Sequence, residues 1–420
     1  MIRYYVLRHI SDAFRRGHTK VNKIHRKRRK VEFFNSSMKR MRIDFKGHLE
    51  DKEEIRVGII GCGSHSQRNV LPVFQFTRIK LVATCDFVLE KAKVYCEKFG
   101  GESYFSDYKE MLEKESLDAV LLIIGNDKRG RPMYPEVAIE CMRAGCHVWI
   151  EKPPATITSE IEDMMRVSKE TGKIAMVGYK KMFVQANRKA KELAYSEDFG
   201  GISMVTMQNP EVIPSEEELR DFIINEKNIH IVAAFMEHLC HPVSQMVSLL
   251  GAPKSMMYDR NSLGAGVIIF QFPSDVIATL HMSCGMAMNG GVERTVIVSR
   301  QGVESTGRIG GRHIIVENNL TLTYHRNPDF GYGDETSFYK GEPNENTAMW
   351  LPEFSRGQMF NKGLFLLGYF DELDEFAKAI LDGTPLVDGT LGQAWVATQI
   401  FEKFTEGQGK VIPLALAPEL

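Results

Sequence analysis

The stretch IRVGIIGCGSHSQRNVLPVFQFTRIKLVATCD, residues 55 to 86, decides the fold of this chain. Its apolar run at 57–60 predicts a buried strand, residues 66–76 predict a helix, and the run at 81–85 predicts a second strand that ends at Asp86. Between the first strand and the helix lies the segment GCG, a turn that residues without a side chain form at low cost. A strand, a glycine turn, a helix, a strand and an acid in this order are typical of a dinucleotide-binding unit.

The residues of the glycine turn predict how the nucleotide binds. Gly61 permits the tight turn, and Gly63 lets the backbone approach a pyrophosphate at the helix N-terminus, where unpaired N–H groups point outward. We count Ser64 and His65, which follow, among the cofactor-binding residues. Asp86 lies about 20 residues beyond the turn, where a carboxylate accepts hydrogen bonds from ribose hydroxyls.

Asp86 also indicates which nucleotide is bound. A carboxylate repels the 2′-phosphate of NADP, and Phe87 supplies no cation to bind one, so the sequence favours NAD over NADP. Ser66 stands where a third glycine is usual, and its small side chain still permits close packing of helix on strand. The alternative is a tight strand–helix turn in an α/β domain that binds no ligand.

The composition is that of a globular protein without cross-links. Hydrophobic residues make up 43% and charged residues 25% of the 420 residues, which is enough to bury a core. None of the seven cysteines forms a C-x-x-C pair and several lie in apolar runs, which indicates a reduced, cytoplasmic protein. No apolar run approaches the roughly 20 residues of a membrane helix, so we expect no membrane.

The charge is distributed unevenly along the chain. Residues 1–47 contain 15 Lys and Arg against 3 Asp and Glu, and the remaining residues carry a net charge of about −13. The acidic body gives no reason to expect nucleic acid. We interpret residues 1–53 as a basic leader, either a disordered tail or an over-long start before Met38 or Met41. A patch for nucleic acid or membrane lipid, or an organelle-targeting segment, remains an alternative.

The pattern of strands and helices divides the rest of the chain in two. From 54 to 178, short apolar runs alternate with helical stretches, which predicts an α/β domain with a parallel sheet covered on both faces. From 179 to 420 we expect an α+β domain. Its five short runs rich in β-formers predict a mostly antiparallel sheet, interrupted by a helix at about 231–250. Residues 325–362 are rich in loops, and two helices, about 363–381 and 391–404, close the chain.

Two motifs follow strands of the parallel sheet, at the edge where ligands bind in such folds. The segment GND at 125–127 opens a loop after the apolar strand at 118–124, and EKPP at 151–154 follows the next strand. The Lys152 ammonium can polarise a carbonyl or hydroxyl oxygen beside a nicotinamide, and the prolines stiffen its backbone. The alternative is a surface lysine in an ordinary turn. Four residues at this edge are expected to contact the cofactor: Gly125, Asn126, Glu151 and Lys152.

The segment EHLCH, residues 237–241, lies on the helix predicted at 231–250. Glu237 and His241 are four residues apart and share a helix face, so the carboxylate can orient the imidazole and raise its basicity. Such a pair suits a general base near neutral pH. A metal site that includes His238, or incidental surface histidines, is the alternative, and we expect no metal.

Two adjacent cations, Lys180 and Lys181, follow the strand at 174–178. They could bind an anionic or hydroxyl-rich substrate, although paired lysines are more often only solvated. Both residues, together with His238, are candidate substrate contacts.

Taken together, these motifs resemble the glucose–fructose oxidoreductase / inositol dehydrogenase (Gfo/Idh/MocA) family. The runs RVGIIGCGSHSQRNVLP, VWIEKPPAT, VGYKKMF and EHLCHPVSQMVSLLG occur in the family's order, and the resemblance covers about residues 54–410. Glu-Lys-Pro after a strand is its most specific sign. The resemblance implies an N-terminal Rossmann domain and a C-terminal domain with a large, mostly antiparallel open sheet. That sheet often forms the oligomer interface, so a homo-oligomer is expected.

The resemblance also implies the chemistry. A hydride passes between the nicotinamide of NAD or NADP and a hydroxyl-bearing carbon of a sugar, polyol or cyclitol, with assistance from Lys152. Glu237 and His241 form the proton relay, and the peptide bond from Lys152 to Pro153 is often cis. Two alternatives belong to the same family: a glycosidase that uses bound NAD for transient oxidation and elimination, and a non-catalytic nucleotide-binding regulator.

The chain departs from the family pattern at four places. Glu237 replaces the usual aspartate, Ser244 stands where an aspartate often follows the histidine, and Met182 replaces a common arginine. The usual Thr-Pro-Asn loop is here Gly-Asn-Asp at 125–127, with extra residues before Tyr134. These differences concern the substrate more than the predicted catalytic residues. The missing arginine argues against a phosphorylated substrate.

Overall fold

The structure is a computed structural model that describes residues 53–283, 285, 293–300, 311–326, 347–350 and 359–418. The interpretation of the basic leader therefore lies outside the described residues, apart from its last position. Most of the loop-rich segment at 325–362 lies outside them as well. Within the described ranges, no helix is long and apolar enough to cross a membrane.

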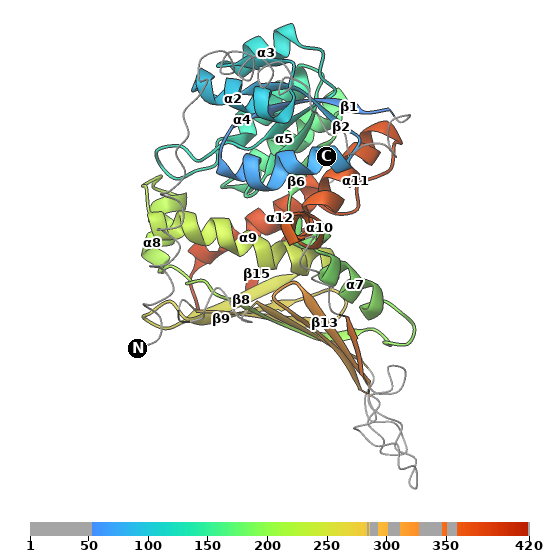
Figure 1. Cartoon of the computed structure of the whole chain (residues 1–420). Coiled ribbons are helices and arrows are strands. Elements are labelled where there is room, and N and C mark those ends of the chain that lie inside the picture. Colours follow the sequence, from blue (N-terminus) through green and yellow to red (C-terminus); the bar gives the residue numbers. More distant parts are fainter. Residues whose placement is uncertain are drawn as a thin grey trace, which may run out of the picture. The chain divides into compact units, whose positions relative to one another are not determined.

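The first half of the chain forms a six-stranded parallel sheet in the order β3-β2-β1-β4-β5-β6 (Figure 1). This is the strand order of the dinucleotide-binding fold, in which ligands bind at the carboxyl edge of the sheet. The strands are β1 (Ile55–Ile60), β2 (Ile79–Cys85), β3 (Ser103–Phe105), β4 (Ala119–Leu122), β5 (His147–Glu151) and β6 (Ala175–Gly178). Four helices accompany them: α2 (Leu89–Phe99), α3 (Tyr108–Lys114), α4 (Tyr134–Arg143) and α5 (Thr158–Thr171).

The segment after the glycine turn is helical but irregular. A π-helical turn at Ser66–Val70 passes into a 3₁₀ helix at Leu71–Phe76, where the sequence predicts one continuous helix. Pro72 lies in the first turn of the second segment and lacks the N–H that a continuous helix would use. The prediction was right about the helical character and wrong about its regularity.

The second half forms a nine-stranded sheet in the order β14-β13-β12-β11-β7-β10-β9-β8-β15. All neighbours are antiparallel except β7 and β10, which confirms the prediction of a mostly antiparallel sheet. The five predicted strands are β7 (Ile202–Asn209), β9 (Gly266–Gln271), β10 (Ile277–Met282), β11 (Arg294–Ser299) and β12 (Arg312–Glu317). Four more strands were not predicted: β8 (Ser255–Arg260), β13 (Thr321–Arg326), β14 (Thr347–Trp350) and β15 (Ile412–Pro413).

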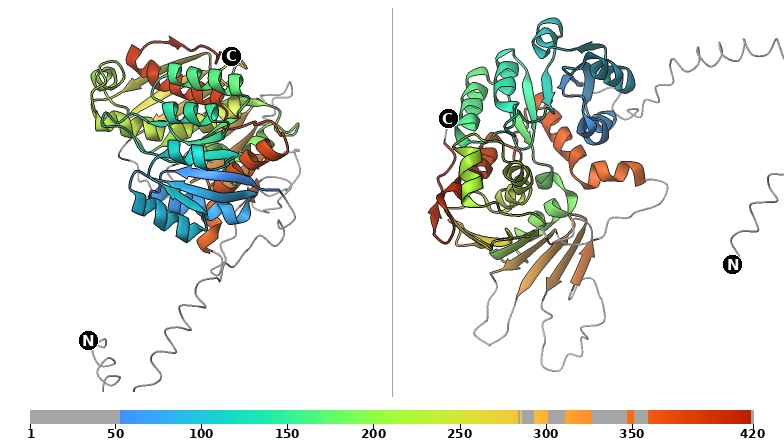
Figure 2. Two further views of the ribbon diagram at one scale, coloured as in Figure 1. Left: turned by 90° about the horizontal axis from the view of Figure 1, so that it is seen from above. Right: turned by 90° about the vertical axis from the view of Figure 1, so that its left-hand side faces the viewer.

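Helices cover one face of this sheet, and the described residues leave the other face uncovered (Figure 2). The covering helices include α7 (Gln185–Ala194) and the long α9 (His230–Leu250), which Figure 1 places between the two sheets. The alternation along β10 matches this arrangement, because Ala278, Leu280 and Met282 are buried while Ile277 is exposed. Shorter helices are α6 (Lys180–Phe183) and α8 (Glu216–Ile223).

The closing helices connect the second half back to the parallel sheet. The helix predicted at 363–381 is two helices, α10 (Met359–Leu366) and α11 (Tyr369–Leu381), separated at Gly368. Gly368 has a φ of +89°, and a Cβ there would lie 2.5 Å from the carbonyl oxygen of Lys180. The break is therefore imposed by a tertiary contact. In α11, Glu372 accepts a hydrogen bond of 3.2 Å from the Trp149 indole of β5, and α12 (Leu391–Lys403) packs on α5 and α9.

Candidate active site

The glycine turn has the geometry that a pyrophosphate requires. Gly61 has a φ of +105°, and a Cβ there would lie 2.1 Å from the carbonyl oxygen of Ile123, so no larger residue fits. A Cβ at Gly63 would meet no atom within 4 Å, which leaves open space beside the turn. Ser66, in place of the third glycine, is buried and donates a hydrogen bond of 2.6 Å to the Gly61 carbonyl. Ser66 thus ties the turn together.

Asp86 lies at the end of β2 and holds the same turn from the other side. Its buried carboxylate accepts hydrogen bonds from the backbone N–H groups of Cys62, at 3.0 Å, and Val88, at 2.9 Å. A carboxylate offers about four acceptor positions, so two hydrogen bonds leave capacity for ribose hydroxyls. The predicted cofactor residue is therefore also a structural part of the turn.

His65 and Glu151 bring buried polar atoms together at the carboxyl edge of the sheet. His65 Nε2 lies 2.8 Å from Glu151 Oε1, and Asn69 Nδ2 lies 3.1 Å from His65 Nδ1. The contact between His65 and Glu151 lacks hydrogen-bond geometry, and Glu151 Oε2 is buried without a partner. Unsatisfied buried polar atoms beside an open glycine turn fit a polar ligand such as a nucleotide. The neighbouring Ser64 is exposed.

The loop after β4 joins the parallel sheet to the second half of the chain. Asn126 donates a hydrogen bond of 2.8 Å from its amide to Glu237 Oε1 on α9. The carbonyl of Lys128, in the same loop, accepts a hydrogen bond of 2.7 Å from the Asn228 side chain. The extra residues that distinguish this loop thus contact the second half of the chain, just before α9. Gly125 faces open space, since a Cβ there would meet no atom within 4 Å.

Lys152 follows β5 in a half-buried position, and the peptide bond between Lys152 and Pro153 is cis, as the resemblance implied. Burial lowers the pKa of Lys152, but Cys240, Glu151 and Glu237 raise it, and the net effect places it above its ordinary value. Burial raises the pKa of the Cys240 thiol to about 12, so the two carboxylates supply the negative charge near neutral pH. Lys152 is therefore a charged ammonium across the neutral range.

His241 lies on α9 with its Nδ1 atom buried and without a hydrogen-bond partner. Burial and the ammonium groups of Lys152, Lys181 and Lys180 lower the pKa of this imidazole well below its ordinary value. The ring is therefore uncharged near neutral pH, which is the form that accepts a proton. Glu237 shares the helix face of His241, but no hydrogen bond joins these two described residues, because the Glu237 carboxylate reaches Asn126 instead.

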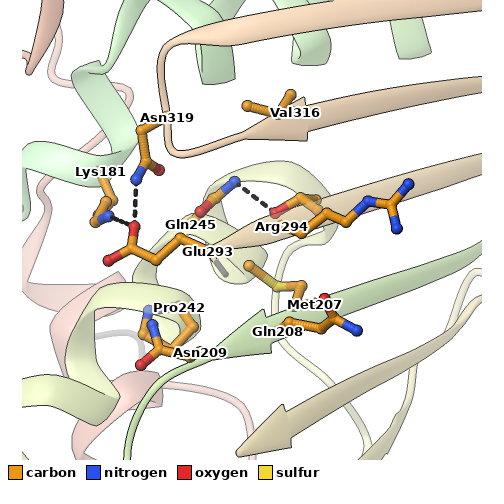
Figure 3. Close-up of a pocket in the computed structure, with 11 residues that line it drawn as sticks. Lys181, Met207, Gln208, Asn209, Pro242, Gln245, Glu293, Arg294, Val316 and Asn319 are labelled. Atoms are coloured by element: carbon orange, nitrogen blue, oxygen red, sulfur yellow. Dashed lines mark hydrogen bonds and ion pairs between the residues drawn. The ribbon is translucent and has the colours of Figure 1, made fainter. Parts of the chain in front are cut away.

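The three candidate substrate contacts differ in their environments. Lys181 forms an ion pair with Glu293, which also accepts a hydrogen bond from Asn319 (Figure 3). These residues line a cavity of about 10 Å³, the space of a single water molecule, so no sugar fits there. His238 Nδ1 contacts a carboxylate oxygen of Glu211.

Lys180 is different, because its ammonium contacts a neutral partner. Its Nζ atom lies 3.1 Å from the hydroxyl of Tyr369, the first residue of α11. The Tyr369 ring also packs edge-on against His65, with ring centroids 5.8 Å apart. Sequence reasoning missed Tyr369, and the only available signal was the glycine that precedes it.

Among the residues that the structure describes, no group of three or more His, Cys, Asp or Glu side chains is arranged to hold a metal ion. The six described cysteines are buried and free, and the seventh, Cys284, lies outside the described residues.

Comparison with known proteins agrees with this geometry. Residues 55–179 match the Gfo/Idh/MocA family, described as "Oxidoreductase family, NAD-binding Rossmann fold". The chain is 30% identical over 129 residues to a 4-carboxy-2-hydroxymuconate-6-semialdehyde dehydrogenase of Sphingobium, covering 31% of this chain and 39% of that protein. It is 29% identical over 154 residues to a D-glucoside 3-dehydrogenase of Escherichia coli, covering 36% and 42%. The chain thus aligns with less than half of the length of either relative.

Structural similarity covers more of the chain than sequence similarity does. The crystal structure of a dehydrogenase from Chromobacterium violaceum superposes with a TM-score of 0.66 at 18% identity, covering 85% of this chain and 96% of that one. At this identity the likeness concerns the fold, which includes both sheets. Residues 55–179 thus match the Gfo/Idh/MocA family of oxidoreductases, and the chain as a whole shares the fold of the Chromobacterium violaceum dehydrogenase.

Proposed function

We propose that the protein is an NAD(P)-dependent dehydrogenase that moves a hydride between the nicotinamide and a hydroxyl-bearing carbon of a sugar, polyol or cyclitol. The observation that carries this proposal is that the charged Lys152 lies near enough to His241 for its charge to lower the pKa of that imidazole. His241 can accept a proton while Lys152 stabilises negative charge on the same oxygen. The family match and the D-glucoside 3-dehydrogenase relative support the reaction class.

His241 is the general base for alcohol oxidation. Its lowered pKa keeps the imidazole uncharged, so it takes the hydroxyl proton while the carbon gives up its hydride. In the reverse direction the protonated imidazole returns that proton to the carbonyl oxygen. Bound NAD supplies the hydride acceptor, and every other step belongs to side chains of this protein.

Lys152 and Glu237 prepare the site for this proton transfer. The Lys152 ammonium donates a hydrogen bond to the reacting oxygen and stabilises the charge that develops there as the proton leaves. Glu237 positions the loop after β4 through its hydrogen bond with Asn126, and its negative charge helps to keep Lys152 protonated. We therefore assign Glu237 a positioning role and leave proton transfer to His241.

The nucleotide is held by the glycine turn and the residues around it. The open space at Gly63 admits the pyrophosphate, and Asp86 accepts hydrogen bonds from the ribose and favours NAD over NADP. The unpartnered atoms of His65 and Glu151 face the same edge of the sheet and bind polar groups of the nicotinamide half.

We further propose that the protein is a cytoplasmic homo-oligomer. Its free, buried cysteines suit a reducing compartment. The uncovered face of the nine-stranded sheet carries apolar side chains such as Met204 and Ile277, which are 42% and 46% exposed. A second copy of that face would bury them. Sedimentation should give a mass above that of one chain, and Ile277→Lys should shift it towards the monomer; a wild-type monomer would contradict the proposal.

The test of the reaction is a panel of sugars, polyols, cyclitols and aryl glycosides, mixed with the protein and NAD or NADP and followed at 340 nm. At least one alcohol should produce reduced nucleotide, and the Lys152→Ala variant should lose that activity. Lys189→Ala is the matched control, because Lys189 pairs with Glu192 on α7 and takes no part in the site. Release of an aryl group without net reduction would instead indicate the glycosidase, and binding without any reaction would indicate the regulator.

A further inference from the structure

A backbone contact between two distant segments brings Lys180 and Tyr369 together. Gly368 packs so closely on Lys180 that a Cβ would lie 2.5 Å from the Lys180 carbonyl oxygen and 2.8 Å from the Phe183 carbonyl carbon. The next residue, Tyr369, is buried and its hydroxyl lies 3.1 Å from Lys180 Nζ. The same ammonium lies 5.0 Å from the centroid of the Tyr369 ring. The pair is therefore fixed by packing.

The Lys180 ammonium has no carboxylate partner among the residues that the structure describes, since none of their acid oxygens lies within 4.0 Å of it. Two other enclosed lysines do have one: Lys181 pairs with Glu293, and Lys191 lies 3.4 Å from Asp388. Burial lowers the pKa of Lys180 and the charge of Lys152 adds to this effect, whereas the charges of Glu151, Glu293 and Glu372 oppose it. A half-buried ammonium in this position is stabilised by any anion that reaches it.

Tyr369 adds a second hydrogen-bond donor beside the Lys180 ammonium. Its oxygen accepts a hydrogen bond from Lys180, so its own O–H is available to a further acceptor. Burial raises the pKa of Tyr369, which keeps the phenol protonated and therefore a donor. An ammonium and a phenol hydroxyl side by side match the two oxygens of a carboxylate, with charge-assisted hydrogen bonds.

The pair belongs to the reaction site. The Tyr369 ring packs edge-on against His65, which lies 2.8 Å from Glu151, the neighbour of Lys152 in the chain. The charge of Lys180 also acts on His241. A group bound by Lys180 and Tyr369 would therefore lie beside the residues proposed to hold the cofactor and to accept the proton.

The geometry points to an acidic substrate, whose carboxylate binds to the Lys180 ammonium and the Tyr369 hydroxyl while a hydroxyl-bearing carbon faces Lys152 and His241. This inference rests on the proposed function and narrows its substrate class to hydroxy acids derived from sugars or cyclitols. A phosphate, with up to two charges, would need a second free cation, but Lys181 is paired with Glu293 and Met182 provides none.

The test is a set of calorimetric titrations, with and without saturating NADH, of three acids and their uncharged counterparts. The pairs are D-glucuronate with D-glucose, D-galacturonate with D-galactose, and D-gluconate with D-glucitol, and D-glucose 6-phosphate is the phosphate arm. At least one acid should bind at least about tenfold more tightly than its counterpart, as expected for one charge-assisted hydrogen bond. Lys180→Met should lower the affinity for that acid by about 10- to 100-fold and the affinity for the uncharged sugar by less than about threefold.

Three variants separate charge from packing. Lys180→Arg should keep most of the preference for the acid. Tyr369→Phe should bind the acid about three- to tenfold more weakly, and the control Lys189→Met should bind it as tightly as the wild type does. Equal binding of acids and neutral compounds by the wild type, equal weakening of both by Lys180→Met, or a preference for the phosphate would overturn the inference. A protein that binds NADH and reduces or oxidises neutral sugars without preferring acids keeps the proposed function and loses this subsite. A protein that prefers an acid but does not bind NADH keeps this carboxylate subsite and loses the proposed function.

Discussion

Replacing Asp86 tests the nucleotide assignment and the structure of the turn at the same time. In Asp86→Ala, the backbone N–H of Cys62 loses its buried acceptor, which costs about 1–3 kcal/mol of folding free energy. The N–H of Val88 is nearer to solvent, and its loss costs about 0.5–1.5 kcal/mol. The variant should therefore be destabilised by about 1.5–4.5 kcal/mol in total, which thermal unfolding measures.

The same substitution should lower the affinity for NAD more than the affinity for NADP. Loss of hydrogen bonds between a carboxylate and ribose hydroxyls costs about 1.5–3 kcal/mol, or roughly 10- to 150-fold in affinity. The affinity for NADP should fall less, because removal of the carboxylate also removes its repulsion of the 2′-phosphate. Asp86→Asn keeps one acceptor oxygen without the charge, so it should retain more stability than the alanine variant and show the same shift towards NADP.

Calorimetric titration with both nucleotides measures the preference, and a control accounts for general damage. Asp107→Ala removes another carboxylate that caps a backbone N–H, that of Lys109 at the start of α3, at 2.8 Å. It should cost about 1 kcal/mol of stability and leave both affinities unchanged. A folded Asp86→Ala protein with the wild-type ratio of NAD to NADP affinity would refute the ribose contact.

Three further predictions follow from the site. Lys152→Ala and His241→Ala should each lower turnover by about 10²-fold or more while NAD affinity in calorimetry stays within about threefold; normal turnover in both would remove the catalytic assignment. Turnover against pH should show its acid limb well below the ordinary pKa of histidine, where His241 becomes protonated; an acid limb at or above that ordinary value would contradict an uncharged His241. Glu372 is buried, and burial with the nearby Glu151 charge raises its pKa well above the ordinary value, so its contribution to stability is present at low pH and is lost as the pH rises. Glu372→Gln should therefore gain stability relative to the wild type from pH 5 to pH 8 in thermal unfolding, and equal curves would refute this.

Local sequence patterns predicted the parts of the site that depend on neighbours in the chain. The glycine turn, the acid at Asp86 and the lysine at 152 are placed by the strand that precedes each of them, and strand ends are readable from apolar runs. Glu237 and His241 share a face because helical spacing alone requires it. The mostly antiparallel sheet was predicted through five of its strands, whereas β8, β13, β14 and β15 were missed.

The parts that were missed depend on contacts between distant segments. Asn126 and Glu237 are 111 positions apart, and their hydrogen bond explains why the expected contact between Glu237 and His241 is absent. Lys180 and Tyr369 are 189 positions apart, and neither periodicity nor composition indicates that they meet. The break at Gly368 was missed for the same reason, since its cause is the backbone of Lys180.

The most direct test of the central claim is a fluorescence titration of the purified protein with NADH and NADPH, followed by the substrate panel at 340 nm. NADH should bind saturably and be displaced by NAD, NADPH should bind more weakly, and at least one hydroxyl-bearing compound should change the absorbance. Failure of both nucleotides to bind would show that the glycine turn at 61–63 is not a nucleotide site.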